Sequence, residues 1–400
     1  MKKTRNYKFR LYPTYGQQKK LQNNIDVCRW LYNHFVESVQ HGFLSRNDMN
    51  YMLTELKQSE PWLYDYNAKM LQMVSTQLDA AQKILKQLCK NGCNTGSLRF
   101  AKYGDYRVFT YNQKGYVLEK HGNKDFLWLS KIGWIKIRRH RNFLGKIKQI
   151  TISKSKTGKW HACVCVDLDC MIPQIDFKRS VGLDVGIKNY AYDSDGHSTP
   201  NILNLQKMLR PLAKANRTLS RRKMGSNNKK RALRWYQIIH ERIANRRKDF
   251  LHKLSNQYTK KYSVVFVERL HKLNMVKNDR LSRAIMDSAW GTFTNMLDYK
   301  SMLIEVPAKN TTVDCSRCGT KVQKSLAIRT HECSMCGLIL DRDHNASLNI
   351  LKKGLQLFHI ELPQELREVT PVKISEMSMK QEHAIEVNGR SHIHKQNFLE

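Results

Sequence analysis

The chain has 400 residues, 41% of them hydrophobic, and 70 lysines and arginines against 34 acidic residues give a formal net charge of +36. This length and hydrophobicity exclude global disorder and predict two or three domains. The charge predicts a polyanionic partner, and no apolar run is long enough to span a bilayer, so we expect no membrane association. The start, MKKTRNYKFRLYP, lacks the apolar stretch of a secretory signal. Nucleic acid in a cytoplasmic compartment is therefore favoured as the partner over a membrane surface or an acidic protein.

The first predicted element is a strand over residues 7–12, YKFRLY, in which apolar and basic residues alternate. Pro13 ends this strand, and Thr14-x-x-Gln17 resembles the capping box that begins a helix. Apolar residues then recur at helical spacing as far as Leu88, which predicts a small helical bundle.

A β-rich stretch is predicted after about residue 97. Residues 133–141 and 145–167 have the pattern of strands joined by a KTG turn. Because this stretch and the first strand flank the helices, we expect one β-barrel with a helical insertion. Cys163 and Cys165 share one strand face, where a structural role is favoured over a ligand role.

Strands and helices alternate from residue 180 onward. SVGLDVGIKNYAYDSDG predicts two strands around a turn, and YSVVFVE, residues 262–268, predicts a strand buried on both faces. Between them, residues 207–249 hold 15 lysines and arginines but only two acids, Glu241 and Asp249. An apolar helix face predicts that this basic segment is anchored; it comprises Trp235, Ile239, Ile243, Phe250 and Leu254.

Two cysteine pairs predict a metal site. Cys315-x-x-Cys318 and Cys333-x-x-Cys336 are separated by 14 residues, and a glycine directly follows each pair. Four thiolates in two such knuckles are typical of a closed, structural, tetrahedral Zn²⁺ site. The other cysteines occur in helix or strand patterns and are predicted to be reduced, buried thiols; they are Cys28, Cys89, Cys93, Cys163, Cys165 and Cys170.

Three acidic residues occupy positions that need an explanation. Asp184 lies in the middle of an apolar strand, where an isolated carboxylate is costly unless it is paired, protonated or bound to a cation. Glu268 closes a second apolar strand, and its alternative role is a salt bridge with Arg269 or Arg242. Asp343 stands at the start of a predicted helix, where an N-cap is the alternative. Together, such a trio can hold two Mg²⁺ ions for phosphodiester hydrolysis.

The order of these motifs resembles one family. GLDVGIKNYA, the basic helix beginning RTLSRRKMG, FVERL, and CSRCG followed by CSMCGLILDRDHNASLNIL are similar to the RuvC-type nuclease of TnpB, an insertion-sequence-encoded relative of type V CRISPR effectors. YKFRLYPTYGQQKKL near the start and REVTPV near the end extend the likeness over nearly the whole chain. One departure is the short link YKSMLIEVPAKN before the zinc ribbon, which brings the packing of its strand into question.

The resemblance implies an RNA-guided DNA endonuclease with an RNase H-like RuvC domain. Its catalytic carboxylates, which would hold two Mg²⁺ ions, would be Asp184, Glu268 and Asp343, with Asp341 in a supporting role. The zinc ribbon would bind target nucleic acid. The partners would be a guide RNA encoded near the transposon end and target double-stranded DNA, and a monomer is favoured. The resemblance also implies a prokaryotic cytoplasm, with the protein associated with the nucleoid. Phosphate contacts are expected from Arg217, Arg221, Arg222, Lys229, Lys230, Arg231 and Arg329.

The family architecture also predicts domain boundaries. The expected parts are a wedge β-barrel (1–14 and 98–175), a helical recognition domain (15–97), a RuvC-like domain (178–311 and 339–365), a zinc ribbon (312–338) and a tail expected to be flexible (366–400).

Two alternatives share this fold. One is a guide-dependent DNA-binding regulator that does not cut, whose signature would be the loss of one of the three acids; none is lost here. The other is a CRISPR-associated type V effector, which the identity of the bound RNA would distinguish. A transposase is disfavoured, because no other nucleophile constellation stands out.

Overall fold

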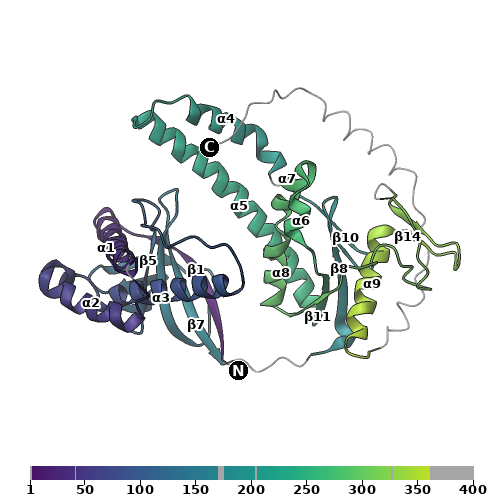
Figure 1. Cartoon of the computed structure of the whole chain (residues 1–400), viewed down its shortest axis with the longest axis horizontal. Helices are drawn as coiled ribbons and strands as arrows, with labels where there is room; N and C mark the ends of the chain where they lie inside the picture. Colours follow the sequence, from purple (N-terminus) through teal and green to yellow (C-terminus); the bar gives the residue numbers. More distant parts are fainter. Residues whose placement is uncertain (1, 41, 170–174, 203–204, 326–327, 361–400) are drawn as a thin grey trace. The chain divides into compact units, whose positions relative to one another are not determined.

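The structure is a computed structural model that describes residues 2–40, 42–169, 175–202, 205–325 and 328–360 (Figure 1). The chain forms two compact units: Met1–Pro173 with Ala215–Glu241, and Gln174–Lys214 with Arg242–Glu400. Cys170 and the tail predicted over 366–400 lie outside the described residues. The domain boundaries expected from the sequence stay a prediction.

The first unit contains a seven-stranded antiparallel sheet in the order β2-β6-β7-β1-β5-β4-β3. Its strands are β1 (Lys2–Tyr12), β2 (Val108–Asn112), β3 (Tyr116–His121), β4 (Lys124–Leu129), β5 (Gly133–Arg138), β6 (Lys146–Lys154) and β7 (Trp160–Asp169). The first strand therefore joins the later β-rich stretch, as predicted. Within the described residues no ladder pairs the edge strands β2 and β3, so closure into a barrel stays a prediction.

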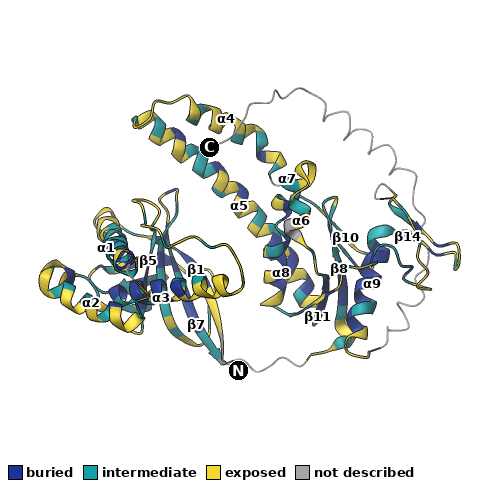
Figure 2. Ribbon diagram, in the orientation of Figure 1, coloured by how far each residue is buried: buried dark blue, intermediate teal, exposed yellow. Residues whose placement is uncertain are grey.

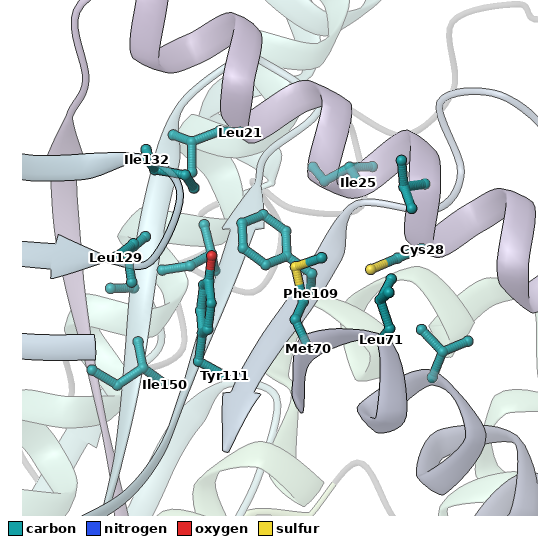
Figure 3. Packing of buried hydrophobic residues seen from close by; sticks show 14 of the residues in the cluster. Leu21, Ile25, Cys28, Met70, Leu71, Phe109, Tyr111, Leu129, Ile132 and Ile150 are labelled. Carbon is teal, nitrogen blue, oxygen red and sulfur yellow. The ribbon is translucent and has the colours of Figure 1, made fainter. Parts of the chain in front are cut away.

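Helices cover this sheet. They are α1 (Tyr15–Val39), α2 (Arg46–Ser59), the 3-10 helix η1 (Pro61–Asp65) and α3 (Ala68–Lys90). The predicted capping box at Thr14 and Gln17 is confirmed, since each residue's side chain accepts a hydrogen bond from the backbone of the other. Apolar side chains of α1 and α3 meet those of β2 in one buried cluster that includes Ile25, Leu71 and Phe109 (Figure 3).

The predicted basic segment forms α4 (Leu209–Ser220) and α5 (Asn227–Lys261). Ile239, Ile243 and Leu254 of α5 are buried, which confirms that the segment is anchored. In the first unit, Glu241 accepts a hydrogen bond from Thr157 at 2.7 Å, in the turn between β6 and β7. Most other side chains of α4 and of the first half of α5 are exposed (Figure 2).

The second unit contains a five-stranded sheet in the order β10-β9-β8-β11-β12. Its strands are β8 (Ser180–Val185), β9 (Asn189–Asp193), β10 (Ser198–Pro200), β11 (Val264–Glu268) and β12 (Met302–Val306), with η2 (Phe177–Arg179) before them and η3 (Gln206–Met208) after β10. The first three strands are antiparallel, and β11 runs parallel to both β8 and β12. The pairing of β12 with β11 extends over five positions, so the short link before the ribbon does not disturb this strand.

Helices lie on both faces of this sheet. They are α6 (Lys272–Val276), α7 (Asp279–Ser288), α8 (Trp290–Asp298) and α9 (Arg342–Gln356). Val265 and Val267 of β11 pack in a cluster with α5, α7 and α8, whereas Val264 and Phe266 pack with α9. The prediction that this strand is buried on both faces is therefore confirmed.

The remaining strands are β13 (Thr330–Glu332) and β14 (Ile339–Asp341), which pair in an antiparallel ribbon directly before α9. No helix within the described residues is long and apolar enough to cross a membrane. Two cysteine predictions were wrong: Cys89 and Cys93 are exposed, because the end of α3 extends beyond the packed part of the helical layer. Cys28 and Cys165 are buried, as predicted, whereas Cys163 is only half-buried.

Candidate active site and metal centre

The four predicted zinc ligands converge. The sulfur atoms of Cys315, Cys318, Cys333 and Cys336 all lie within 4.8 Å of one another, and two of the separations are 3.6 Å (Cys315 to Cys336) and 3.5 Å (Cys318 to Cys333). Zn–S bonds of about 2.3 Å in a tetrahedron require sulfur atoms roughly 3.8 Å apart. The four thiols therefore fit a Zn²⁺ ion without rearrangement of the backbone.

Local backbone geometry explains why a glycine follows each cysteine pair. Gly319 and Gly337 adopt positive φ angles of 79° and 68°, a conformation that costs little only for glycine. Their amides donate hydrogen bonds to the carbonyls of Cys315 (2.9 Å) and Cys333 (2.8 Å), which closes each knuckle. Both cysteine pairs are thus brought into position by short loops rather than by distant contacts.

Asp184 and Glu268 lie near the carboxyl ends of neighbouring parallel strands. The ladder between β8 and β11 pairs Leu183 with Val267, and the two acids are the next residues on each strand. Adjacent residues in such a ladder are separated by roughly 4.8 Å and point to the same face. This geometry brings the two carboxylates to one edge of the sheet.

Helix α9 carries Asp343 to the same edge. The helix packs closely on the sheet because Gly182 and Gly354 leave no space for a Cβ: one added at Gly182 would collide with the backbone of Ser347 and Leu351, and one at Gly354 with the ring of Phe266. Most of α9 is buried (Figure 2).

The alternative of Asp343 as the helix N-cap was wrong. Asp341 is the N-cap of α9, and its side chain accepts a hydrogen bond of 2.7 Å from the backbone amide of Asp343. Asp343 is in the first helical turn instead. Its carboxylate is therefore not needed for capping.

The three carboxyl groups interact electrostatically, and their pKa values reflect this interaction together with burial. The pKa of Asp184 is raised to about 8, first by burial and then by the neighbouring charges of Asp343 and Glu268. Burial is also the main reason that the pKa values of Glu268 and Asp343 are raised, and the charge of Asp341 adds to the effect on Asp343. Such a cluster gains free energy from any cation that enters it.

The salt bridge considered for Glu268 is replaced by a different contact. Oε1 of Glu268 accepts a hydrogen bond of 2.5 Å from Oγ1 of Thr311, which lies in the loop before the first knuckle. Arg269 pairs with Glu305 at 3.2 Å. Arg269, one of the two alternatives considered, is therefore not the partner of Glu268, because the strand ends at Glu268 and the Arg269 side chain turns toward β12.

Two arginines flank Asp343. Oδ1 of Asp343 lies 3.5 Å from Nη1 of Arg329 and 3.6 Å from Nε of Arg342. Both charges lower the pKa of Asp343, against the larger effect of burial. Arg329, expected to contact phosphate, thus lies beside one of the candidate catalytic acids.

The other expected phosphate contacts are on the basic helices. Arg217 is on α4, two arginines follow in the turn, and three basic residues begin α5. The side chains of Arg217, Arg221, Arg222, Lys230 and Arg231 are exposed, and that of Lys229 is half-buried. Within the described part of the chain, none of these six forms an ion pair with an acidic residue.

The sequence analysis missed the residues that join the two sites. Thr311, Asn345 and Asn349 are buried polar residues that link the first knuckle, α9 and Glu268. Asn345 and Asn349 lie four residues apart on α9, and this spacing of amides on one helix face could have identified them. No comparable signal marks Thr311.

The two sites differ in how closely their ligands approach. Within the described residues, the four cysteines are the only group of three or more His, Cys, Asp or Glu ligand atoms that lie within 4.8 Å of one another. The three carboxylates are coupled electrostatically, since the charges of Asp343 and Glu268 both raise the pKa of Asp184 after burial has done so.

Three family models match the chain. A family described as "Probable transposase" matches residues 163–279, "Cas12f1-like, TNB domain" matches residues 290–350, and "Helix-turn-helix domain" matches residues 1–43. The last segment folds here as β1 followed by the single helix α1. A chain in the "Cryo-EM structure of the Cas12f1-sgRNA-target DNA complex" has a TM-score of 0.50 at 14% identity, covering 88% of this chain and 99% of that chain. The mixed α/β fold is shared with this effector.

Two curated relatives match over most of their length. "Putative RNA-guided DNA endonuclease InsQ" of Escherichia coli (strain K12) is 29% identical over 383 residues, which cover 88% of this chain and 93% of that protein. "Putative RNA-guided DNA endonuclease" of Streptomyces pristinaespiralis is 30% identical over 374 residues, covering 88% and 89%. The motif order, the cysteine cluster and this near full-length similarity lead to one conclusion: the chain belongs to the TnpB family.

Proposed function

We propose that this chain is an RNA-guided DNA endonuclease that cuts phosphodiester bonds of guide-complementary DNA beside a short flanking motif. The observation that carries the proposal is the convergence of Asp184, Glu268 and Asp343 from β8, β11 and α9 at one edge of the sheet. The order of that sheet, three antiparallel strands followed by two parallel ones, supports an RNase H-like nuclease. The names of the two curated relatives point to the same activity.

The carboxylates supply the oxygen ligands that Mg²⁺ prefers, and thiolates suit Zn²⁺. Mg²⁺ would therefore bind at the carboxylates and Zn²⁺ at the cysteines. Two Mg²⁺ ions bound at the three acids would activate a water molecule and stabilise the leaving oxygen. Because the pKa of Asp184 is raised to about 8, its carboxyl group must lose a proton before all three acids can bind cations. Arg329 and Arg342 would orient Asp343 beside the scissile phosphate.

The guide would supply sequence recognition by base pairing, while the protein holds the backbone and reads the flanking motif. In this proposal α4 and the start of α5 contact phosphates of the guide RNA or the heteroduplex, which would make binding steeply salt-dependent. The seven-stranded sheet and its helices would be the wedge and recognition domains, and the ribbon over 312–338 would contact target DNA. The RNA would be encoded near the transposon end, and the protein would act as a monomer.

The experiment is purification of the protein with its RNA, followed by cleavage of DNA complementary to that RNA in the presence of Mg²⁺. We expect Asp184→Ala, Glu268→Ala and Asp343→Ala each to abolish cutting and to leave RNA binding unchanged. Glu305→Ala is the matched control, because Glu305 is an exposed acid on β12 paired with Arg269. Cutting that persists in all three variants would overturn the proposal. Sequencing the bound RNA would separate a transposon-encoded guide from a CRISPR-array guide.

A further inference from the structure

The segment that leads into the first knuckle, Thr311–Ser316, is held by two buried amides of α9. Nδ2 of Asn345 donates to the carbonyl of Asp314 (2.9 Å), and Oδ1 of Asn345 accepts from the amide of Ser316 (2.9 Å). Nδ2 of Asn349 donates to the carbonyls of Thr311 (2.9 Å) and Asp314 (2.6 Å). The knuckle is thereby fixed to the same helix that carries Asp343.

The same segment reaches Glu268. Thr311, Asn345 and Asn349 are 2%, 0% and 5% exposed, so these hydrogen bonds form away from water. Buried hydrogen bonds of this kind are costly to lose, since neither partner can turn to solvent instead. The hydroxyl of Thr311 donates to Oε1 of Glu268, which fixes the orientation of that carboxylate and leaves Oε2 available.

We infer that Thr311 is a positioning residue for Glu268. The hydrogen bonds of Asn345 and Asn349 make the position of Thr311 depend on the zinc knuckle. Loss of the knuckle would free Thr311–Ser316 from its fixed end, and Glu268 would lose its hydrogen-bond donor. This inference rests on the proposed function, because it assumes that Glu268 binds a divalent ion. Outer hydrogen bonds to ligating carboxylates typically affect metal affinity by about 10- to 100-fold.

The test is Mn²⁺ binding to the zinc-loaded, full-length protein, followed by electron paramagnetic resonance. Thr311→Val, which removes the hydroxyl at nearly constant shape, should weaken Mn²⁺ binding by about tenfold. Thr311→Ser, which restores the donor, should bind within about threefold of wild type. Thr312→Val is the matched control, because the adjacent threonine forms no side-chain hydrogen bond within the described residues, and it should bind as wild type does. Zinc content should stay equal in all four proteins.

A double-mutant cycle tests the dependence on the knuckle. Cys318→Ser should also weaken Mn²⁺ binding, and adding Thr311→Val should produce little further loss. If the two substitutions weaken Mn²⁺ binding independently, so that their fold-changes multiply, the link between the knuckle and Glu268 is wrong. Equal losses in Thr311→Val and Thr311→Ser, or wild-type binding in both, would overturn the role of the hydroxyl.

Failure of the proposed function gives a different result. If Glu268→Gln binds Mn²⁺ as tightly as wild type, Glu268 is not a ligand and the proposed active site is wrong. If Glu268→Gln loses binding and Thr311→Val does not, only the positioning role is wrong.

Discussion

The cysteine cluster and the carboxylate site lie in the same unit but are assembled by different means. Two short loops bring the four cysteines within 4.8 Å of one another, and each loop is closed by its own hydrogen bonds and glycine. The three acids come from β8, β11 and α9 and meet only when the whole sheet has formed. The cysteine cluster, the soft site, therefore depends on local turns, whereas the carboxylate cluster, the hard site, depends on assembly of the whole sheet.

Electrostatics separates the sites further. Burial raises the pKa values of Cys315 and Cys336, whereas hydrogen bonding with Thr320 lowers that of Cys318 to about 6, so the thiols approach one another with little opposing charge. The carboxylates repel one another, which adds to the effect of burial in raising the pKa of Asp184. Arg329 and Arg342 lie beside Asp343, and the charge of Arg342 also lowers the pKa of Asp184.

The largest expected effect tests whether the soft site is a zinc site. Replacing Cys333 and Cys336 together with serine should remove about one zinc ion per chain, measured by mass spectrometry of metal content, and unfold the ribbon. Cleavage should fall by more than about tenfold because Thr311 and Arg329 lose their anchorage. The matched control is Cys89→Ser with Cys93→Ser, since these cysteines are exposed and belong to the other unit. Well-folded wild-type protein without zinc would contradict the assignment.

The next prediction, which turns on the small effect of replacing Asp341, tests which aspartate belongs to the carboxylate site. Asp341→Asn should retain most cleavage, because asparagine caps a helix about as well as aspartate does. Asp341→Ala should cost about 1 kcal/mol of stability through the lost cap. Asp343→Asn, in contrast, should abolish cutting with little change in stability. The measurements are the cleavage rates and thermal unfolding of the three variants. Faster cleavage by Asp343→Asn than by Asp341→Asn would exclude Asp343 as the ligand.

Patterns within a few residues were sufficient to predict much of the fold. The capping box at Thr14, the CxxCG knuckles and the doubly buried strand β11 each follow from local sequence, and all three are confirmed. The expectations that failed concern the burial of Cys89 and Cys93 and the choice among partners or caps, rather than the elements themselves. Asp341 and Asp343 are equally suited to cap α9, and only the backbone geometry decides between them.

Long-range contacts could not be predicted. Thr311 is 43 positions from Glu268, and nothing in the sequence distinguishes it from Thr312. Arg269 was the natural partner by proximity, but the end of β11 directs it to Glu305. The positions of the three acids could be predicted from the motif pattern, whereas the contacts that orient them depend on how α9 and the ribbon pack.

The smallest expected effect concerns the raised pKa of Asp184, which burial and then the charges of Asp343 and Glu268 produce. In the absence of added divalent ions, the folded pKa of Asp184 is about 8, against about 4 for an unfolded aspartate. Between these values the folded state binds more protons than the unfolded state, so wild-type stability falls as the pH rises from about 4 to about 8. Asp184→Asn removes this titration. Its melting temperature should therefore match wild type near pH 5 and exceed it by roughly a few degrees near pH 8.

The matched control is Asp249→Asn, because Asp249 is an exposed acid on α5 whose partner is Lys253, and this variant should follow wild type at both pH values. Added Mg²⁺ should stabilise wild type but not Asp184→Asn, which would distinguish a cation site from a simple buried acid. A constant difference in melting temperature across this pH range would show that Asp184 does not have the raised pKa that burial and its acidic neighbours produce.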